Sequence, residues 1–140
     1  MIAFPLILSA YLGVADRARD EAVAALARRG PSDVAALQLG ELENAHLSAS
    51  VLWERMLVIA ESGSPGPATT SEVMALRMMV GRNVLLTVER AMEAVGGSSF
   101  YRGGPIERAF RDVQGARFHP MPEKQQLMLS GRVAAGWDIG

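Results

Sequence analysis

The last third of the sequence concentrates the residues that could bind a phosphate. Two glycine pairs, Gly96-Gly97 and Gly103-Gly104, stand at predicted helix ends, where the backbone can approach an anion and free amides can donate to it. Arginine makes two-point contacts with phosphate, and four arginines are clustered here: Arg102, Arg108, Arg111 and Arg117. The alternative is that these arginines form ion pairs with Glu107 and Asp112 that hold a short helix on its neighbours.

A second pattern, Glu43-x-x-His46, has the spacing found in the di-iron sites of helix bundles. Such a site needs two of these motifs and two further carboxylates, but the residue three positions before His119 is Ala116. We therefore interpret the single motif as a chance occurrence and expect no metal site. The sequence contains neither a Gly-x-Ser-x-Gly elbow nor a P-loop. It also has no cysteine, which excludes a thiolate nucleophile.

The composition is that of a globular protein, with 49% hydrophobic and 21% charged residues in a chain of 140. The net charge of −1 creates no field that would attract nucleic acid or an anionic membrane, so we expect neither as a partner. The apolar run Met1–Ala15 lacks a basic start and is too short to span a membrane. Because its helical period continues to Ala25, we expect a buried helix in a cytoplasmic protein rather than a secretory signal.

The elements that position these residues are predicted to be helices, because apolar residues recur every three or four positions and show no sustained alternation. Ser32 or Asp33 is expected to cap the second helix, and the Thr69–Glu72 capping-box pattern is expected to begin the third. The other boundaries fall at Gly30, Ser62–Pro67, Gly96-Gly97, Pro105, Val113, Pro122 and Gly136. The sequence therefore predicts one all-α domain over residues 1–140. We expect an up-and-down four-helix bundle with a short extra helix near the C-terminus, and the third helix as the inner one.

Three segments together resemble the C-terminal domain of the acyl-CoA dehydrogenase superfamily. Ala91–Gly97 resembles the family's long helix closed by Gly-Gly, and Pro105–Arg108 resembles its Pro-x-Glu-Arg motif, with Arg111-Asp112 following at the expected spacing. Tyr11–Ala15 is also similar to the first helix of that domain. The resemblance extends from about Ile2 to Gly136, and it implies the same bundle that the periodicity predicts.

The resemblance implies the C-terminal domain of an FAD-dependent oxidoreductase acting on CH–CH bonds of acyl thioesters. This domain supplies part of the flavin site and contacts within a homo-oligomer. In the family, a helical domain and a β-domain precede the bundle and hold much of the flavin. Since this sequence begins where the bundle begins, we expect it to lack those domains. Alone, it is then expected neither to retain FAD nor to turn over substrate.

The resemblance also implies cofactor-binding residues. The region of Gly96 and Gly97 corresponds to the segment that approaches the adenosine diphosphate part of an FAD held by a neighbouring subunit. Arg28 matches the arginine of the family's Arg-x-x-Phe-Gly motif, whose other two positions are Pro31 and Ser32 here. Glu93 replaces the usual glutamine three residues before the Gly-Gly pair.

The catalytic position departs from the dehydrogenase pattern. Many dehydrogenases of the family have a Glu in a Tyr-Glu-Gly-Thr segment, and the corresponding segment here is His119–Pro122, with Pro120 in the place of the Glu. The position of the base in other members falls near Ala3. In the flavin-dependent monooxygenase branch a histidine follows the Arg-Asp pair, and His119 fits that position as an acid–base residue. Two alternatives therefore remain: a monooxygenase domain that uses His119, and a stand-alone helical module that self-associates through its apolar first helix.

Overall fold

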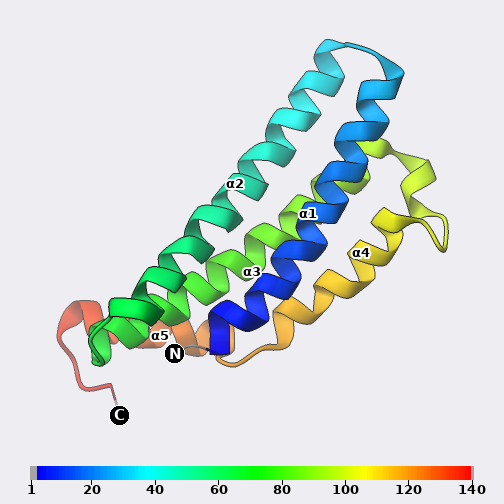
Figure 1. Ribbon diagram of the computed structural model, residues 1–140. Coiled ribbons are helices and arrows are strands. Elements are labelled where there is room, and N and C mark those ends of the chain that lie inside the picture. The colour runs from blue at the N-terminus through cyan, green and yellow to red at the C-terminus, as the bar shows by residue number, and fades with distance from the viewer. Residues whose placement is uncertain (1–2, 140) are drawn as a thin grey trace.

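The computed structural model describes residues 3–139, which form five α-helices and two short 3-10 turns (Figure 1). No strand occurs within this range. The α-helices are α1 (Ala3–Arg29), α2 (Asp33–Ser62), α3 (Pro67–Val95), α4 (Pro105–Val113) and α5 (Glu123–Ala135). The 3-10 turns are η1 (Gly97–Phe100) and η2 (Gln114–Phe118).

Helices α1 to α4 run alternately up and down beside one another, which confirms the predicted all-α bundle (Figure 1). Helix α3 packs against α1, α2, α4 and α5, so it is the inner helix, as its wide apolar surface predicts. Helix α4 takes the fourth place in the bundle although it is the shortest helix. Helix α5 contacts α3 and crosses one end of the bundle.

The core is built from small side chains on α1 and branched ones on α3. Ala15, Ala18 and Ala22 are fully buried along α1, and this row of alanines lets the neighbouring helices approach closely. On α3 the fully buried branched aliphatic residues are Val80, Val84 and Val88. Methionines of the same helix, such as Met74 and Met92, are only partly buried and pack against the edge of this core.

Most helix boundaries lie where local signals predict them. Ser32 caps α2 by accepting a hydrogen bond from the amide of Ala35 at 3.1 Å. Gly136 ends α5 in the left-handed conformation. The expected capping box at Thr69 is wrong, because Pro67 occupies the first turn of α3 and the helix begins there. The Thr69 hydroxyl instead donates to the carbonyl of Ser64 at 2.7 Å.

Candidate functional site

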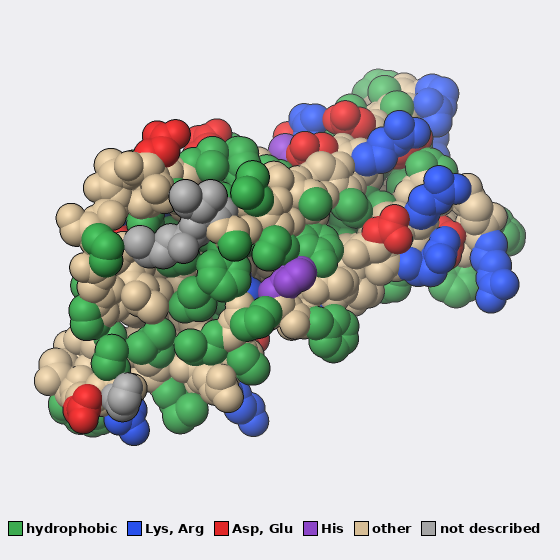
Figure 2. Space-filling model, turned by 60° about the horizontal axis from the view of Figure 1, so that its bottom comes forward, with side chains coloured by type: hydrophobic (Ala, Val, Ile, Leu, Met, Phe, Trp, Pro, Cys, Tyr) green, Lys and Arg blue, Asp and Glu red, His purple; other side chains and the backbone are tan. Residues whose placement is uncertain are grey.

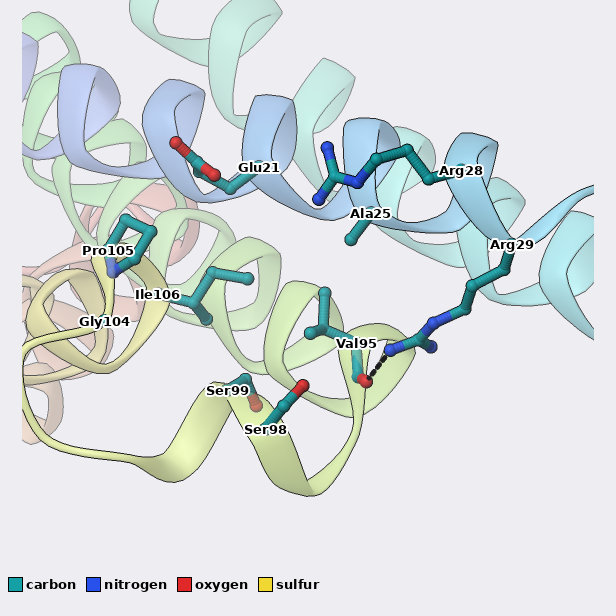
Figure 3. Close-up of a pocket in the computed structure, with 10 residues that line it drawn as sticks. All are labelled: Glu21, Ala25, Arg28, Arg29, Val95, Ser98, Ser99, Gly104, Pro105 and Ile106. Atoms are coloured by element: carbon teal, nitrogen blue, oxygen red, sulfur yellow. Dashed lines mark hydrogen bonds between the residues drawn. The ribbon is translucent and has the colours of Figure 1, made fainter.

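An open cleft of ≈ 320 Å³ lies where the C-terminal ends of α1 and α3 meet η1 and the start of α4 (Figure 3). From α1 the cleft is lined by Glu21, Ala25, Arg28 and Arg29. The opposite side is formed by Val95, Ser98, Ser99, Gly104, Pro105 and Ile106. The cleft therefore adjoins the predicted cofactor residues Gly96 and Gly97, which stand between Val95 and Ser98, and it includes Arg28.

The turn at Gly96 requires glycine because its φ is +83°. Its amide donates to the carbonyl of Met92 at 2.9 Å and ends α3. The buried hydroxyl of Ser99 lies 3.0 Å from the Met92 carbonyl and 2.6 Å from the Gly96 carbonyl, so it holds the turn on the end of the helix. Gly97 has no positive φ, and a Cβ added there would meet nothing within 4 Å.

The two arginines at the end of α1 have different roles. Arg29 donates to the carbonyls of Ala94 at 3.3 Å and Val95 at 2.6 Å, so it caps the C-terminal end of α3. Arg28 is exposed along the cleft and makes no hydrogen bond or ion pair with any residue between 3 and 139. Of the two arginines that line this cleft, Arg28 is therefore the one that remains available for an anionic ligand. The capping role of Arg29 was not predicted from the sequence.

The carboxylates near this cleft are already engaged with arginines. Glu93, which replaces the family's glutamine, is exposed, pairs with Arg90 at 2.6 Å and does not line the cleft. Glu21 lines the cleft but pairs with Arg17 at 2.7 Å. Both negative charges are thus partly compensated, which reduces their repulsion of an anion beside Arg28.

His119 lies at the other end of the bundle, in the segment between η2 and α5. Its Nε2 is 2.8 Å from the hydroxyl oxygen of Tyr11 on α1. The two rings meet edge to face, with centroids 5.4 Å apart and an interplanar angle of 63°. Both side chains are half-buried. Within the described part of the chain, no carboxylate hydrogen-bonds to either ring.

Arg77 holds the backbone of the His119 segment. This residue of α3 is only 5% exposed, and it donates to the carbonyls of Ala116 at 3.4 Å, Met121 at 3.3 Å and His119. Burial lowers the pKa of the Arg77 guanidinium from its ordinary value. Arg77 was not predicted as a site residue, although it interrupts an apolar row four residues after Val73 and three before Val80.

The structure does not bring the predicted catalytic and cofactor-binding residues together. Tyr11, which contacts His119, and Arg28 are both on α1 and are seventeen positions apart, about 25 Å along the helix at 1.5 Å per residue. In the view of Figure 2, most of the charged side chains gather toward the end with the α1–α2 turn, and hydrophobic side chains cover part of the remaining surface. The molecule therefore has two separate candidate sites, one at each end.

Glu43 and His46 form contacts between α1 and α2. Arg19 donates to the two carboxylate oxygens of Glu43 at 2.7 and 3.0 Å, and His46 Nε2 lies 2.6 Å from Asp16. Residues 3–139 contain no group of three His, Cys, Asp or Glu side chains that could hold a metal ion. The Glu-x-x-His spacing is therefore accounted for by helix packing.

Among the described residues, no arginine of α4 pairs with another helix, contrary to the alternative considered above, whereas Arg117 of η2 pairs with Glu89 of α3 at 3.7 Å. Glu107 pairs with Arg111 at 2.6 Å, but both belong to α4 itself. Arg108 has no ion-pair partner among the residues described. Helix α4 is held instead by three buried apolar residues: Ile106, Ala109 and Val113.

Comparison with known proteins identifies the family of the bundle. The model of the acyl-CoA dehydrogenase C-terminal domain matches residues 6–123. The chain belongs to this family. None of the described helices has the length and hydrophobicity needed to cross a membrane.

Two curated relatives and one solved structure are similar to this chain. The putative acyl-CoA dehydrogenase YdbM of Bacillus subtilis is 33% identical over 119 residues, covering 79% of this chain and 31% of the relative. The amino sugar nitrososynthase DnmZ of Streptomyces peucetius is 28% identical, covering 93% of this chain and 35% of the relative. The chain thus spans about a third of the curated relatives it matches.

The solved structure is that of KijD3 in complex with FMN and a dTDP-linked amino sugar. It superposes with a TM-score of 0.85 and 27% sequence identity, covering 94% of this chain and 35% of KijD3. The likeness extends over nearly the whole chain, so the bundle corresponds to one region of KijD3.

Proposed function

We propose that this chain is the C-terminal domain of a flavin-dependent oxidoreductase of the monooxygenase type, in which His119 contacts the flavin or substrate. The observation that carries the proposal is the His119 site itself. A half-buried histidine, hydrogen-bonded to Tyr11 at 2.8 Å, stands in the segment where dehydrogenases that resemble this chain have a catalytic Glu. The similarity to a nitrososynthase and to FMN-bound KijD3 supports the same proposal.

A bound flavin would supply the redox chemistry, while this chain supplies groups that position and move protons. An imidazole can hold or transfer a proton near neutral pH. Pro120, which follows His119, has no group that can do so. His119 is half-buried, so part of its side chain is exposed, while its Nε2 contacts the Tyr11 hydroxyl.

The cleft at the opposite end fits the nucleotide part of FAD. Arg28 offers an unpaired cation, and Ser98 lines the cleft beside the Gly96 turn (Figure 3). The carboxylate of Glu93 is held by Arg90 outside the cleft. We propose that this cleft receives the diphosphate region of an FAD carried by a second subunit, since Tyr11, which contacts His119, lies about 25 Å from Arg28 along α1.

This arrangement requires a homo-oligomer, which the outer surface of α2 would favour. Five aliphatic side chains are half or more exposed on α2: Val34, Leu37, Leu47, Val51 and Val58. By contrast, α1 directs its row of alanines into the core, so α2 is a better self-association surface than the apolar first helix. A self-associating module without catalysis would use the same surface, but it would give no role to the unpaired Arg28.

The second candidate function is oxidation of an acyl thioester, favoured by the 33% identity to a putative acyl-CoA dehydrogenase. Removal of an acidified proton needs a carboxylate base, and none hydrogen-bonds to His119 or Tyr11 among the described residues. On this alternative the base would come from a part of the protein outside the bundle.

The decisive experiment compares His119→Ala with His46→Ala in the full-length flavoprotein that contains this chain. His46 is the matched control because it is a half-buried histidine paired with Asp16 on α1. The assay measures oxygen-dependent product formation with a dTDP-linked amino sugar and flavin reduction by a medium-chain acyl-CoA. We expect His119→Ala to lower oxygenation about 100-fold at unchanged flavin content, and His46→Ala to leave it intact. Full oxygenation by His119→Ala, or reduction of the wild-type flavin by the acyl-CoA, would contradict the proposal.

The nucleotide cleft is tested separately with Arg28→Ala and Arg108→Ala in the same protein. Both arginines are exposed, and neither has an ion-pair or side-chain hydrogen-bond partner among residues 3–139. Arg108, however, lies in a different groove, between α1 and α4. We expect Arg28→Ala to bind FAD about tenfold more weakly, because the variant loses one charge-assisted contact. Equal FAD affinity in the two variants would exclude Arg28 from the nucleotide site.

A further inference from the structure

Tyr11 and His119 form a side-chain pair that joins the two ends of the chain. They are separated by 108 positions, yet the Tyr11 hydroxyl oxygen lies 2.8 Å from His119 Nε2. We infer that Tyr11 is a positioning residue that fixes His119 in the tautomer with its proton on Nδ1, so that the ring presents a hydrogen-bond donor, not a base, to its ligand. The inference about the ligand rests on the proposed function, whereas the tautomer is a property of this chain.

The direction of the hydrogen bond follows from the partners available to each group. Tyr11 makes no other side-chain hydrogen bond with a described residue, so its hydroxyl hydrogen has only His119 Nε2 to donate to. If Nε2 carried the proton instead, the phenol would have no acceptor among the described residues and would depend on water reaching a half-buried hydroxyl, which is less favourable than donating to Nε2. The phenol therefore donates, Nε2 accepts, and a neutral His119 carries its proton on Nδ1.

The surroundings hold both partners in this geometry. A Cβ added at Gly115 would lie 2.5 Å from the Tyr11 hydroxyl oxygen, so glycine at this position leaves the room that the phenol occupies. Arg77 binds the His119 carbonyl and, at 3.3 Å, the Met121 carbonyl, which fixes the backbone on both sides of Pro120. The pair is thus built by α1, α3 and η2 together, not by one flexible loop.

The consequence is a defined role for His119. Nδ1 has no hydrogen-bond partner within residues 3–139, so its N–H remains available to an oxygen of a ligand. If that oxygen takes the Nδ1 proton, Nε2 accepts the Tyr11 hydroxyl proton and leaves a phenolate. Nε2 then returns that proton to the phenolate while Nδ1 takes a proton from water, with hydroxide released to the solvent, so the starting tautomer is regenerated. The relay transfers one proton to the ligand and restores the neutral pair without a redox step.

The test is the tautomer of His119, read from long-range ¹H–¹⁵N correlation spectra of the ¹⁵N-labelled chain under mildly alkaline conditions. We expect wild-type His119 to show the Nδ1–H pattern. Tyr11→Phe should shift the tautomer ratio about fivefold or more toward Nε2–H, which is the factor contributed by one ordinary hydrogen bond. His46 provides an internal control in the same spectrum, because its Nε2 contacts Asp16 and its pattern should not change.

A second variant, Gly115→Ala, displaces the phenol without removing it and should shift the same ratio in the same direction. An Nε2–H pattern for wild-type His119, or an unchanged ratio in Tyr11→Phe with the His46 signals intact, would overturn the inference. The spectra involve no flavin, so they separate the two proposals. A confirmed tautomer combined with full oxygenation by His119→Ala would refute only the proposed function.

Discussion

Replacing Arg77 with methionine removes the guanidinium that holds the His119 segment while keeping an unbranched side chain in the core. The carbonyl of Ala116 belongs to a buried residue, so losing its donor costs about 1–3 kcal/mol. The carbonyls of His119 and Met121 belong to half-buried residues that water can reach, and each loses about 0.5–1.5 kcal/mol.

Part of this loss of stability is offset, because the variant no longer buries a cation. Arg77 Nε is buried without a partner, and the desolvation that lowers the pKa of the guanidinium is no longer incurred in the variant. We therefore expect Arg77→Met to lower the free energy of unfolding by about 3 kcal/mol. For a domain of this size that corresponds to a decrease in Tm of about 10 °C.

The assay is urea and thermal unfolding of the chain followed by circular dichroism, with Arg82→Met as the matched control. Arg82 is an exposed arginine on the same helix that pairs with Glu123, and its loss should cost less than about 1 kcal/mol. Arg77→Lys keeps the charge with fewer directed donors and should fall between Arg77→Met and the wild type. Arg77→Met within about 0.5 kcal/mol of the wild type, or equal to Arg82→Met, would refute the role given to Arg77.

Three further changes test the local structure. Gly96→Ala should destabilise the chain by about 1–2 kcal/mol in urea unfolding because of the positive φ, while the control Gly97→Ala should cost less than about 0.5 kcal/mol; equal losses would contradict this. Ser32→Ala should lose about 1 kcal/mol with the N-cap hydrogen bond, and an unchanged Tm would contradict it. The hydrogen bond from Arg111 lowers the pKa of Glu107, so its stabilising effect is present above an unfolded-state pKa of about 4.3 and disappears as the pH falls through the lower folded-state pKa. Glu107→Gln should therefore lose stability less steeply in that acid range, and parallel curves of Tm against pH would exclude this contribution.

The parts of the fold that depend on neighbouring residues could be predicted from the sequence. Pro105 and Val113 bound α4 as expected, because proline suits the first turn and the following residues keep a helical period. Gly136 ends α5 for an equally local reason. The mistake at Thr69 arose where two local signals competed, and Pro67 began the helix before the capping-box pattern was reached.

The parts of the site that depend on distant residues could not be predicted in the same way. His119 could be singled out as a candidate, but its contact with Tyr11 joins residues 108 positions apart, and spacing along one sequence says nothing about such a pair. Arg77 was not predicted, but its place beside the apolar row of α3 is a local signal that could have indicated a buried polar contact. What the sequence could not give was the set of carbonyls that Arg77 binds, since these come from a segment with no regular period.

The two candidate sites are connected by one helix, and this decides how the bundle can act in the proposed flavoprotein. Tyr11 and Arg28 are both on α1, and the buried alanines between them pack the helix closely against its neighbours. A closely packed helix keeps their separation near 25 Å. In the proposed flavoprotein, a ligand at His119 and a nucleotide at Arg28 would therefore be held at a fixed distance. In an oligomer, the same domain would then position its own active site while binding a cofactor that belongs to the neighbouring subunit.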